Sequence, residues 1–151
     1  MINVAQFQQE IFHWAIEKGW WPLKSETRVG DKTSTVVIEL ERVNIPEKFC
    51  LMHEEISEAL GDYRDNRRMN EIYYEDADHH KYSAAEYVEI QREADGQAWG
   101  YKPCGVPIEL ADCIIRILDF SEAFGIDMEW ALRTKQDFNK TRPYRHGGRK
   151  A

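Results

Sequence analysis

Four carboxylates occur in two pairs with the same spacing. Glu55 and Glu58 lie three residues apart, and so do Glu109 and Asp112. Residues three apart are neighbours on the surface of an α-helix, so each pair would present its oxygens side by side. Each pair borders the apolar stripe of its helix, whereas a solvated charged face would lie opposite that stripe. If the two helices pack side by side, the four carboxylates converge, and such a group needs cations.

Oxygen-only ligands select hard cations, so converging carboxylates predict Mg²⁺, with Mn²⁺ able to substitute for it. Acidic residues are common on helix surfaces, and for either pair alone a solvated face is the better interpretation. The presence of two pairs, each beside an apolar stripe, favours a metal centre.

Cations and one amide share a helix face near the end of the sequence. Lys135, Asn139 and Arg142 are spaced i, i+4 and i+7, and Arg145 follows. Such a group is typical of a phosphate-binding face. The alternative is a solvated helix end whose cations interact favourably with the helix dipole. Charge matching favours phosphate, because two divalent ions and these cations nearly balance four carboxylates and a triphosphate.

Composition restricts the class of protein. The chain has 151 residues, 42% of them hydrophobic and 31% charged, which predicts a single soluble domain. No apolar run approaches the length of a membrane span, and the N-terminal residues lack the pattern of a signal peptide, so we expect a cytoplasmic protein with no membrane partner. Three cysteines without a CxxC pair argue against a disulfide scaffold or a zinc ribbon.

The charge distribution bears on partners. The net charge is −7, yet residues 133–150 carry seven basic residues and one acidic residue. A duplex-binding protein needs a broad positive face, which an acidic body with a short basic end does not offer. We therefore expect no stable nucleic-acid partner.

Helical periodicity predicts an all-α bundle of four main helices. Asn44 followed by Pro46 and Glu47 forms a strong helix start, and Asp127 is a second capping residue. The β-branched residues near 35–40 fit either a short strand or a buried turn of helix. Residues 70–106 are interpreted as an insertion, within which 83–93 is compatible with a short helix. The four main helices are expected over residues 3–18, 46–68, 107–125 and 127–141.

The paired acid motif resembles one known family. Glu-Glu-x-x-Glu at 54–58 followed by Glu-x-x-Asp at 109–112 resembles the MazG-like, all-α nucleoside triphosphate pyrophosphatases. Segments 105–119, 125–127 and 139–148 look like the bacteriophage and actinobacterial branch of that family. Some fifty residues separate the two motifs here, more than is usual in the family, so the insertion is expected to lie over the active site or to build an interface.

The resemblance implies hydrolysis of a nucleoside or deoxynucleoside triphosphate to the monophosphate and pyrophosphate, with dGTP or GTP as a candidate substrate. It implies a homodimer or homotetramer, in the host cytoplasm if a phage encodes the chain. It also implies a Mg²⁺ site formed by Glu55, Glu58, Glu109 and Asp112. Glu54 would support these ligands or act as a base. Phosphate contacts would come from Lys135, Asn139, Arg142 and Arg145.

Two alternative functions and one other group of potential metal ligands fit the sequence less well. A di-iron bundle needs Glu-x-x-His pairs, which neither acid motif contains. A non-enzymatic nucleotide- or nucleic-acid-binding helical module using the basic C-terminal segment leaves the acid pairs unexplained. Asp76, Asp78, His79 and His80 have the composition of metal ligands but no fixed spacing, which favours an exposed loop.

Overall fold

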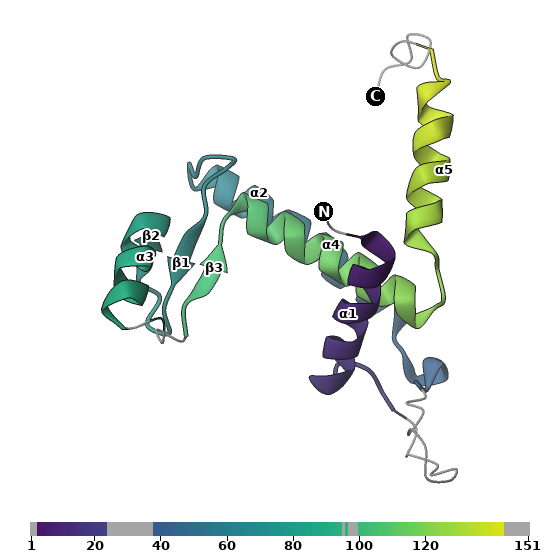
Figure 1. Ribbon diagram of the computed structural model, residues 1–151, viewed down its shortest axis with the longest axis horizontal. Helices are drawn as coiled ribbons and strands as arrows, with labels where there is room; N and C mark the ends of the chain where they lie inside the picture. Colours follow the sequence, from purple (N-terminus) through teal and green to yellow (C-terminus); the bar gives the residue numbers. More distant parts are fainter. Residues whose placement is uncertain (1–2, 24–37, 95, 97–99, 144–151) are drawn as a thin grey trace. The chain divides into compact units, whose positions relative to one another are not determined.

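A computed structural model describes residues 3–23, 38–94, 96 and 100–143 of the chain (Figure 1). It divides the chain into two compact units, Met1–Val43 with Leu118–Ala151, and Asn44–Ile117. Helix α4 (Val106–Ala123) contributes residues to both units. Among the described residues, no helix is both long enough and apolar enough to cross a membrane.

The first unit is built on α1 (Val4–Glu17), η1 (Leu40–Arg42), the end of α4 and α5 (Met128–Lys140). Its buried apolar residues are Ile11, Ala15, Trp21 and Leu118. Burying an indole leaves its N–H in need of an acceptor. Trp21 Nε1 donates to Asp119 Oδ1 at 2.8 Å, and both residues are buried.

Helix limits in the first unit agree with the sequence pattern. The Asn3 side chain accepts from Gln6 N and starts α1, and the Asp127 side chain accepts from Trp130 N and starts α5. Thr141 is the C-terminal cap of α5. The short strand considered near 35–40 falls mainly on residues outside the described ranges. Ile38, which is described, forms an isolated antiparallel bridge with Leu23.

The second unit contains α2 (Ile45–Arg64) and the N-terminal two thirds of α4. Asn44 caps α2 as expected, although the helix ends at Arg64 instead of near residue 68. The two helices run antiparallel. Cys113 Sγ lies 3.5 Å from the Met52 carbonyl oxygen, and Glu109 interacts with Glu58 further along α2.

The described chain is mostly helical, as predicted, but the insertion adds a small sheet that the all-α prediction did not include. The insertion folds into a three-stranded antiparallel sheet of order β2-β1-β3. Its strands are β1 (Tyr73–Glu75), β2 (Lys81–Ser83) and β3 (Lys102–Cys104). Helix α3 (Ala84–Glu93) lies between β2 and β3 in the sequence. The described residues therefore hold the four main helices that were predicted and, as α3, the short helix considered at 83–93. Strands of three residues are too short to show an alternating pattern in the sequence, which is why the sheet was not predicted.

The sheet has two chemically different faces. Tyr74 stacks on Tyr87 of α3, with ring centroids 3.7 Å apart. Tyr73, one residue earlier, points to the other face, where its hydroxyl donates to Asp62 Oδ1 of α2 at 3.0 Å. The Arg67 guanidinium lies 4.3 Å from the centre of the Tyr73 ring. The sheet is thus attached to α3 on one side and to α2 on the other.

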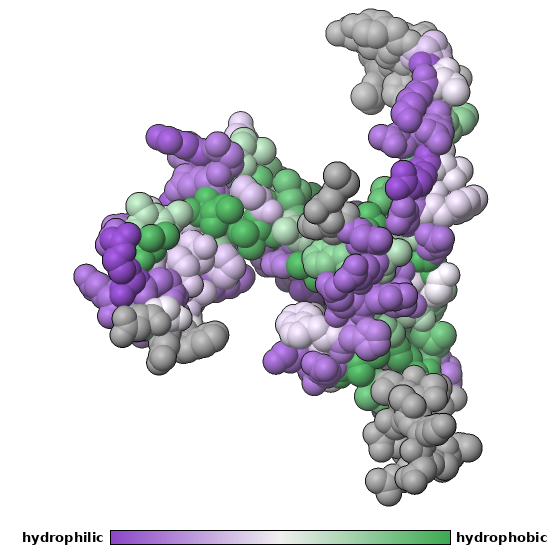
Figure 2. Space-filling model, viewed as in Figure 1, coloured by the Kyte–Doolittle hydropathy of each residue, from purple (hydrophilic) through white to green (hydrophobic). Residues whose placement is uncertain are grey.

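Much of the apolar surface of the helix pair stays uncovered in the described chain (Figure 2). The sequence pattern predicts a core-facing stripe on α2 made of Phe49, Met52, Ile56, Ala59, Leu60 and Tyr63. Of these residues, only Ala59 is buried and Met52 is half-buried. The exposed fractions are between 44% and 54% for Phe49, Ile56, Leu60, Leu110 and Ile114. Large apolar side chains on both α2 and α4 are therefore about half exposed in the described chain.

The junction of β3 and α4 depends on Gly105. Its φ angle is +116°, a conformation that favours glycine. A Cβ at this position would lie 2.3 Å from the backbone oxygen of Glu71. The backbone at Glu71 belongs to the chain entering β1, so it cannot move without moving the sheet.

We expect Gly105→Ala to destabilise the protein by more than about 2 kcal/mol, because it combines backbone strain with a backbone clash. Gly61→Ala is the matched control, since Gly61 lies within α2 and has open space where the Cβ would be. That change should stabilise by about 0.5–1 kcal/mol. Urea unfolding of the three proteins measures both effects. Equal stability of the Gly105→Ala variant and the wild type would show that the junction is not constrained in this way.

Candidate metal centre

Three of the four predicted carboxylates meet between α2 and α4. Glu55, Glu109 and Asp112 each place a carboxylate oxygen within 4.8 Å of the others. The spacing of Glu109 and Asp112 puts both on one side of α4, and the antiparallel packing brings Glu55 opposite them. Glu55 and Glu109 are each only 5% exposed. The sequence therefore placed these carboxylates together correctly.

Glu109 is the least satisfied member of the group. Its Oε2 atom is buried and has no hydrogen-bond partner. Burial raises the pKa of Glu109 to about 7; the Lys102 charge opposes the rise, and a hydrogen bond shared with Glu58 adds to it. The fourth predicted carboxylate, Glu58, thus contacts the group through Glu109, although Glu58 itself is exposed.

Arg116 partly neutralises the group. Its Nε donates to Glu55 Oε1 at 2.5 Å, and Arg116 lies one turn beyond Asp112 on α4. This hydrogen bond holds the Glu55 side chain toward α4. Four carboxylates still outnumber the two cations that interact with them, Arg116 and Lys102.

These residues fit a hard divalent cation. A buried carboxylate oxygen without a donor is costly unless a cation or a proton satisfies it. The converging ligand atoms of Glu55, Glu109 and Asp112 are all carboxylate oxygens, the donor type that Mg²⁺ and Mn²⁺ prefer. The fit rests on the unpartnered Glu109 atom together with the convergence of the three side chains.

Lys102 was missed in the sequence. It lies on β3, inside the segment interpreted as an insertion. Burial opposes its charge, yet the charges of Glu109, Cys104, Glu58 and Asp112 raise its pKa overall. In the sequence, Lys102 lies only seven residues before Glu109, which could have suggested that the two side chains are close. That inference also requires knowing that the chain changes at Gly105 from a strand to α4.

Glu54 does not join the group. It precedes Glu55 on α2, so its side chain is rotated by about 100° around the helix axis. It is exposed and is not among the converging oxygens. Its proposed role in catalysis therefore stays a prediction.

Of the predicted phosphate-binding residues, Lys135 and Asn139 lie on α5 in the first unit, and Arg142 follows the C-terminal cap of that helix. The Lys135 ammonium and the Arg142 guanidinium lie 5.4 and 5.8 Å from the centre of the Phe138 ring, so the structure brings these two cations to one aromatic side chain. Asn139 is exposed beside them. Arg145 lies outside the described residues. Phosphate binding by this face stays a prediction.

A second group, Asp76, Asp78 and His80, also brings potential ligand atoms together, between β1 and β2. Its geometry follows from the hairpin turn. Asp76 Oδ1 accepts from the backbone nitrogens of Asp78 and His80, both at 2.9 Å, and Asp76 Oδ2 accepts from Tyr82 at 2.9 Å. These hydrogen bonds account for the cluster, in agreement with the predicted exposed loop.

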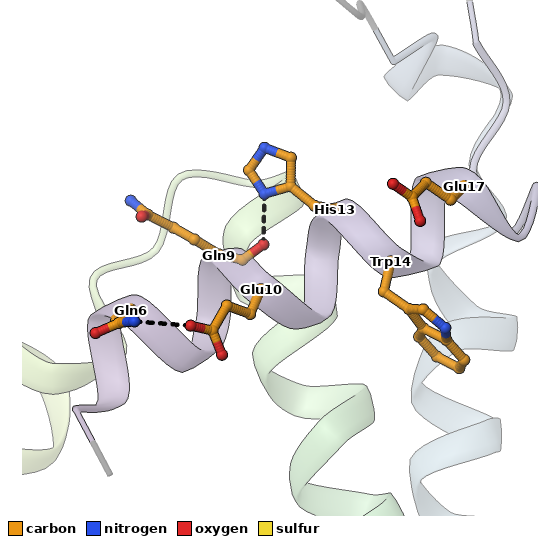
Figure 3. Close-up of a pocket in the computed structure, with 6 residues that line it drawn as sticks. All are labelled: Gln6, Gln9, Glu10, His13, Trp14 and Glu17. Carbon is orange, nitrogen blue, oxygen red and sulfur yellow. Dashed lines mark hydrogen bonds between the residues drawn. The ribbon is translucent and has the colours of Figure 1, made fainter.

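A shallow surface depression lies along α1 (Figure 3). Its lining residues come from a single helix, and one of them, Trp14, is 42% exposed. Trp14 packs edge-on against Trp20 with centroids 4.7 Å apart. None of the lining residues is one of the converging carboxylates. The full lining is Gln6, Gln9, Glu10, His13, Trp14 and Glu17.

Comparisons with protein-family models, with curated proteins and with solved structures found no match for this chain.

The raised pKa of Glu109 predicts how stability depends on pH. The ordinary value is 4.5 and the folded value is about 7, so the folded state binds the proton more tightly than the unfolded chain does. The resulting stabilisation is complete below about pH 4.5 and is lost as the pH rises through about 7. In EDTA, we expect the melting temperature to fall between about pH 5 and about pH 8, and to fall less in Glu109→Gln.

Glu93→Gln on α3 is the control, because Glu93 is exposed and should leave the wild-type slope unchanged. Adding Mg²⁺ at about pH 8 should restore the melting temperature of the wild type more than that of Glu109→Gln. Parallel slopes for wild type and Glu109→Gln would contradict the assignment.

Proposed function

We propose that this protein is a metal-dependent nucleoside triphosphate pyrophosphohydrolase of the MazG-like type. The observation that carries the proposal is the unpartnered, buried Glu109 Oε2 within a group of carboxylates on two antiparallel helices. The resemblance of the motifs at 54–58 and 109–112 to that family supports the same assignment. The substrate would be a nucleoside or deoxynucleoside triphosphate, with dGTP or GTP as a candidate.

Glu55, Glu58, Glu109 and Asp112 would hold Mg²⁺. A bound metal would act as a Lewis acid toward the phosphate and would lower the pKa of a coordinated water. Arg116 orients Glu55 through the hydrogen bond at 2.5 Å. In the reaction, a water oxygen forms a bond to the α-phosphorus while the bond to the bridging oxygen breaks, and pyrophosphate leaves.

Lys135 on α5 and Arg142, just after the end of that helix, would bind the phosphates. Arg142 is suited to this role because a guanidinium binds phosphate through two parallel hydrogen bonds. Lys135 shares the Phe138 ring with Arg142, and Asn139 lies on the same helix. Arg145 would extend this face.

Removing one metal-binding charge should abolish most of the activity. We expect Glu109→Gln and Asp112→Asn each to lower kcat/KM by at least about a hundredfold, because electrostatic stabilisation of the transition state is lost while the shape of the side chain is nearly kept. Product analysis with Mg²⁺ or Mn²⁺ and all common nucleotides should show monophosphate and pyrophosphate. EDTA should abolish turnover.

Glu93→Gln should retain wild-type turnover in the same assay.

Arg142→Lys should raise KM without changing the Mg²⁺ requirement. Release of inorganic phosphate would contradict the cleavage position. Absence of hydrolysis together with tight DNA binding in a gel shift would favour the non-enzymatic alternative.

A second copy of the chain is the occupant we propose for the exposed apolar surface of α2 and α4. Phe49, Ile56 and Leu60 recur at spacings of seven and four on α2, which is the pattern of a helix that packs against other helices. Leu110 and Ile114 extend the surface on α4. A homodimer or homotetramer would cover these side chains.

Light scattering at micromolar concentration should therefore report a mass well above the 17.8 kDa of one chain. The double variant Ile56→Glu, Ile114→Glu should shift the mass toward the monomer, because it places charges in the interface. Val88→Glu on α3 is the control, since Val88 is equally exposed at 53% but lies outside this surface. A monomeric wild type would refute the proposal.

A further inference from the structure

Lys102 lies on the face of the sheet that contacts α2. In the register of β1 and β3, Tyr73 pairs with Cys104, and Glu75 pairs with Lys102. Side chains of paired residues share a face, and residues two apart on a strand do too. Lys102 therefore lies on the same face as Tyr73, whose hydroxyl donates to Asp62 of α2.

One fixed turn joins Lys102 to the carboxylates. The Gly105 carbonyl accepts from Ile108 N at 2.8 Å and from Glu109 N at 3.1 Å, which closes the first turn of α4. Lys102 precedes this turn and Glu109 follows it. The positive φ of Gly105 and its close approach to Glu71 restrict the backbone at this junction. The electrostatic coupling of Lys102 with Glu109, Glu58 and Asp112 is consistent with this placement.

Lys102 differs from Arg116 in how it relates to these carboxylates. Arg116 donates directly to Glu55. Within the described ranges, no carboxylate oxygen forms a direct ion pair with the Lys102 ammonium. Its three donors are therefore available to a ligand, while the surrounding negative charge keeps the side chain charged. A cation beside a group of metal-binding carboxylates is suited to an anion that must also contact the metal.

We propose that Lys102 binds a phosphate oxygen of the substrate at the candidate metal centre, so that the insertion contributes a substrate-binding residue to the site. The inference rests on the proposed function for its substrate class. The insertion would then take part in substrate binding, because β3 holds Lys102 directly before α4. A residue with only a structural role, acting as a counter-ion to Glu109, would affect stability and metal binding but not phosphate binding.

The sheet offers a matched control in Lys81. Both lysines are cross-strand partners of Glu75, Lys81 from β2 and Lys102 from β3. The Lys81 ammonium lies 5.2 Å from the centre of the Tyr73 ring, and it is not among the charges that act on Glu109. Replacing either lysine by Met removes one ammonium next to Glu75 and keeps the apolar stem. Only Lys102→Met should affect the site.

Calorimetric titration of the full chain separates metal binding from phosphate binding. The probes are Mg²⁺ alone and then inorganic triphosphate at saturating Mg²⁺. We expect Lys102→Met to weaken triphosphate binding by about ten- to a hundredfold, as expected for loss of a charged hydrogen bond. Mg²⁺ binding should be unchanged or tighter, because a nearby cation has been removed. Lys102→Arg should recover part of the affinity, and Lys81→Met should match the wild type.

Wild-type triphosphate affinity in Lys102→Met would overturn the proposal, and so would an equal loss in Lys81→Met. Lack of triphosphate binding by the Mg²⁺-loaded wild type would overturn it as well. If triphosphate binds as expected but no nucleotide is hydrolysed, the proposed activity fails while the assignment of Lys102 stands. Circular dichroism of each variant verifies that it is folded, and Lys102→Arg provides the test if Lys102→Met is not.

Discussion

The burial of the Glu109 carboxyl group is the constraint on which the second unit depends. A charged carboxylate that is 5% exposed needs a proton, a donor or a cation, and one of its oxygens has no donor in the described chain. Lys102 and Glu58 act on this cost in different ways. Lys102 favours the charged form, whereas the hydrogen bond shared with Glu58 favours the protonated form. Together with burial, these influences give Glu109 a pKa of about 7. A divalent cation that binds there would displace the proton.

The position of this carboxyl group depends on the β3–α4 junction. Glu109 sits in the first turn of α4, so any movement of Gly105 would move both the carboxylate and Lys102. The sheet attaches the junction to α2 through Tyr73, which is buried, lies beside Arg67 and donates to Asp62 on α2. The insertion and the helix pair are therefore one structural unit, in agreement with the limits Asn44–Ile117.

The helices and the acid pairs could be predicted from the sequence because their signals are local. Asn44 and Asp127 are capping residues that act within three residues, and the i, i+3 spacing of Glu109 and Asp112 is a property of one helix. The sheet could not be predicted, because its strands are short and their pairing joins residues far apart in the sequence, as with Tyr73 and Cys104. Lys102 was missed for the same reason.

The prediction that the apolar stripe of α2 faces the core was wrong, and the reason is geometric. Glu55 and Ile56 are adjacent on α2, as Glu109 and Leu110 are on α4, so neighbouring side chains point about 100° apart. Turning the carboxylates inward therefore turns the next apolar residues outward: Glu55 is 5% exposed and Ile56 is 50% exposed. A single helix pair cannot bury both sets. The arrangement keeps the charged groups together within the chain and leaves apolar surface available to a partner, so cation binding and assembly would stabilise different faces of the same two helices.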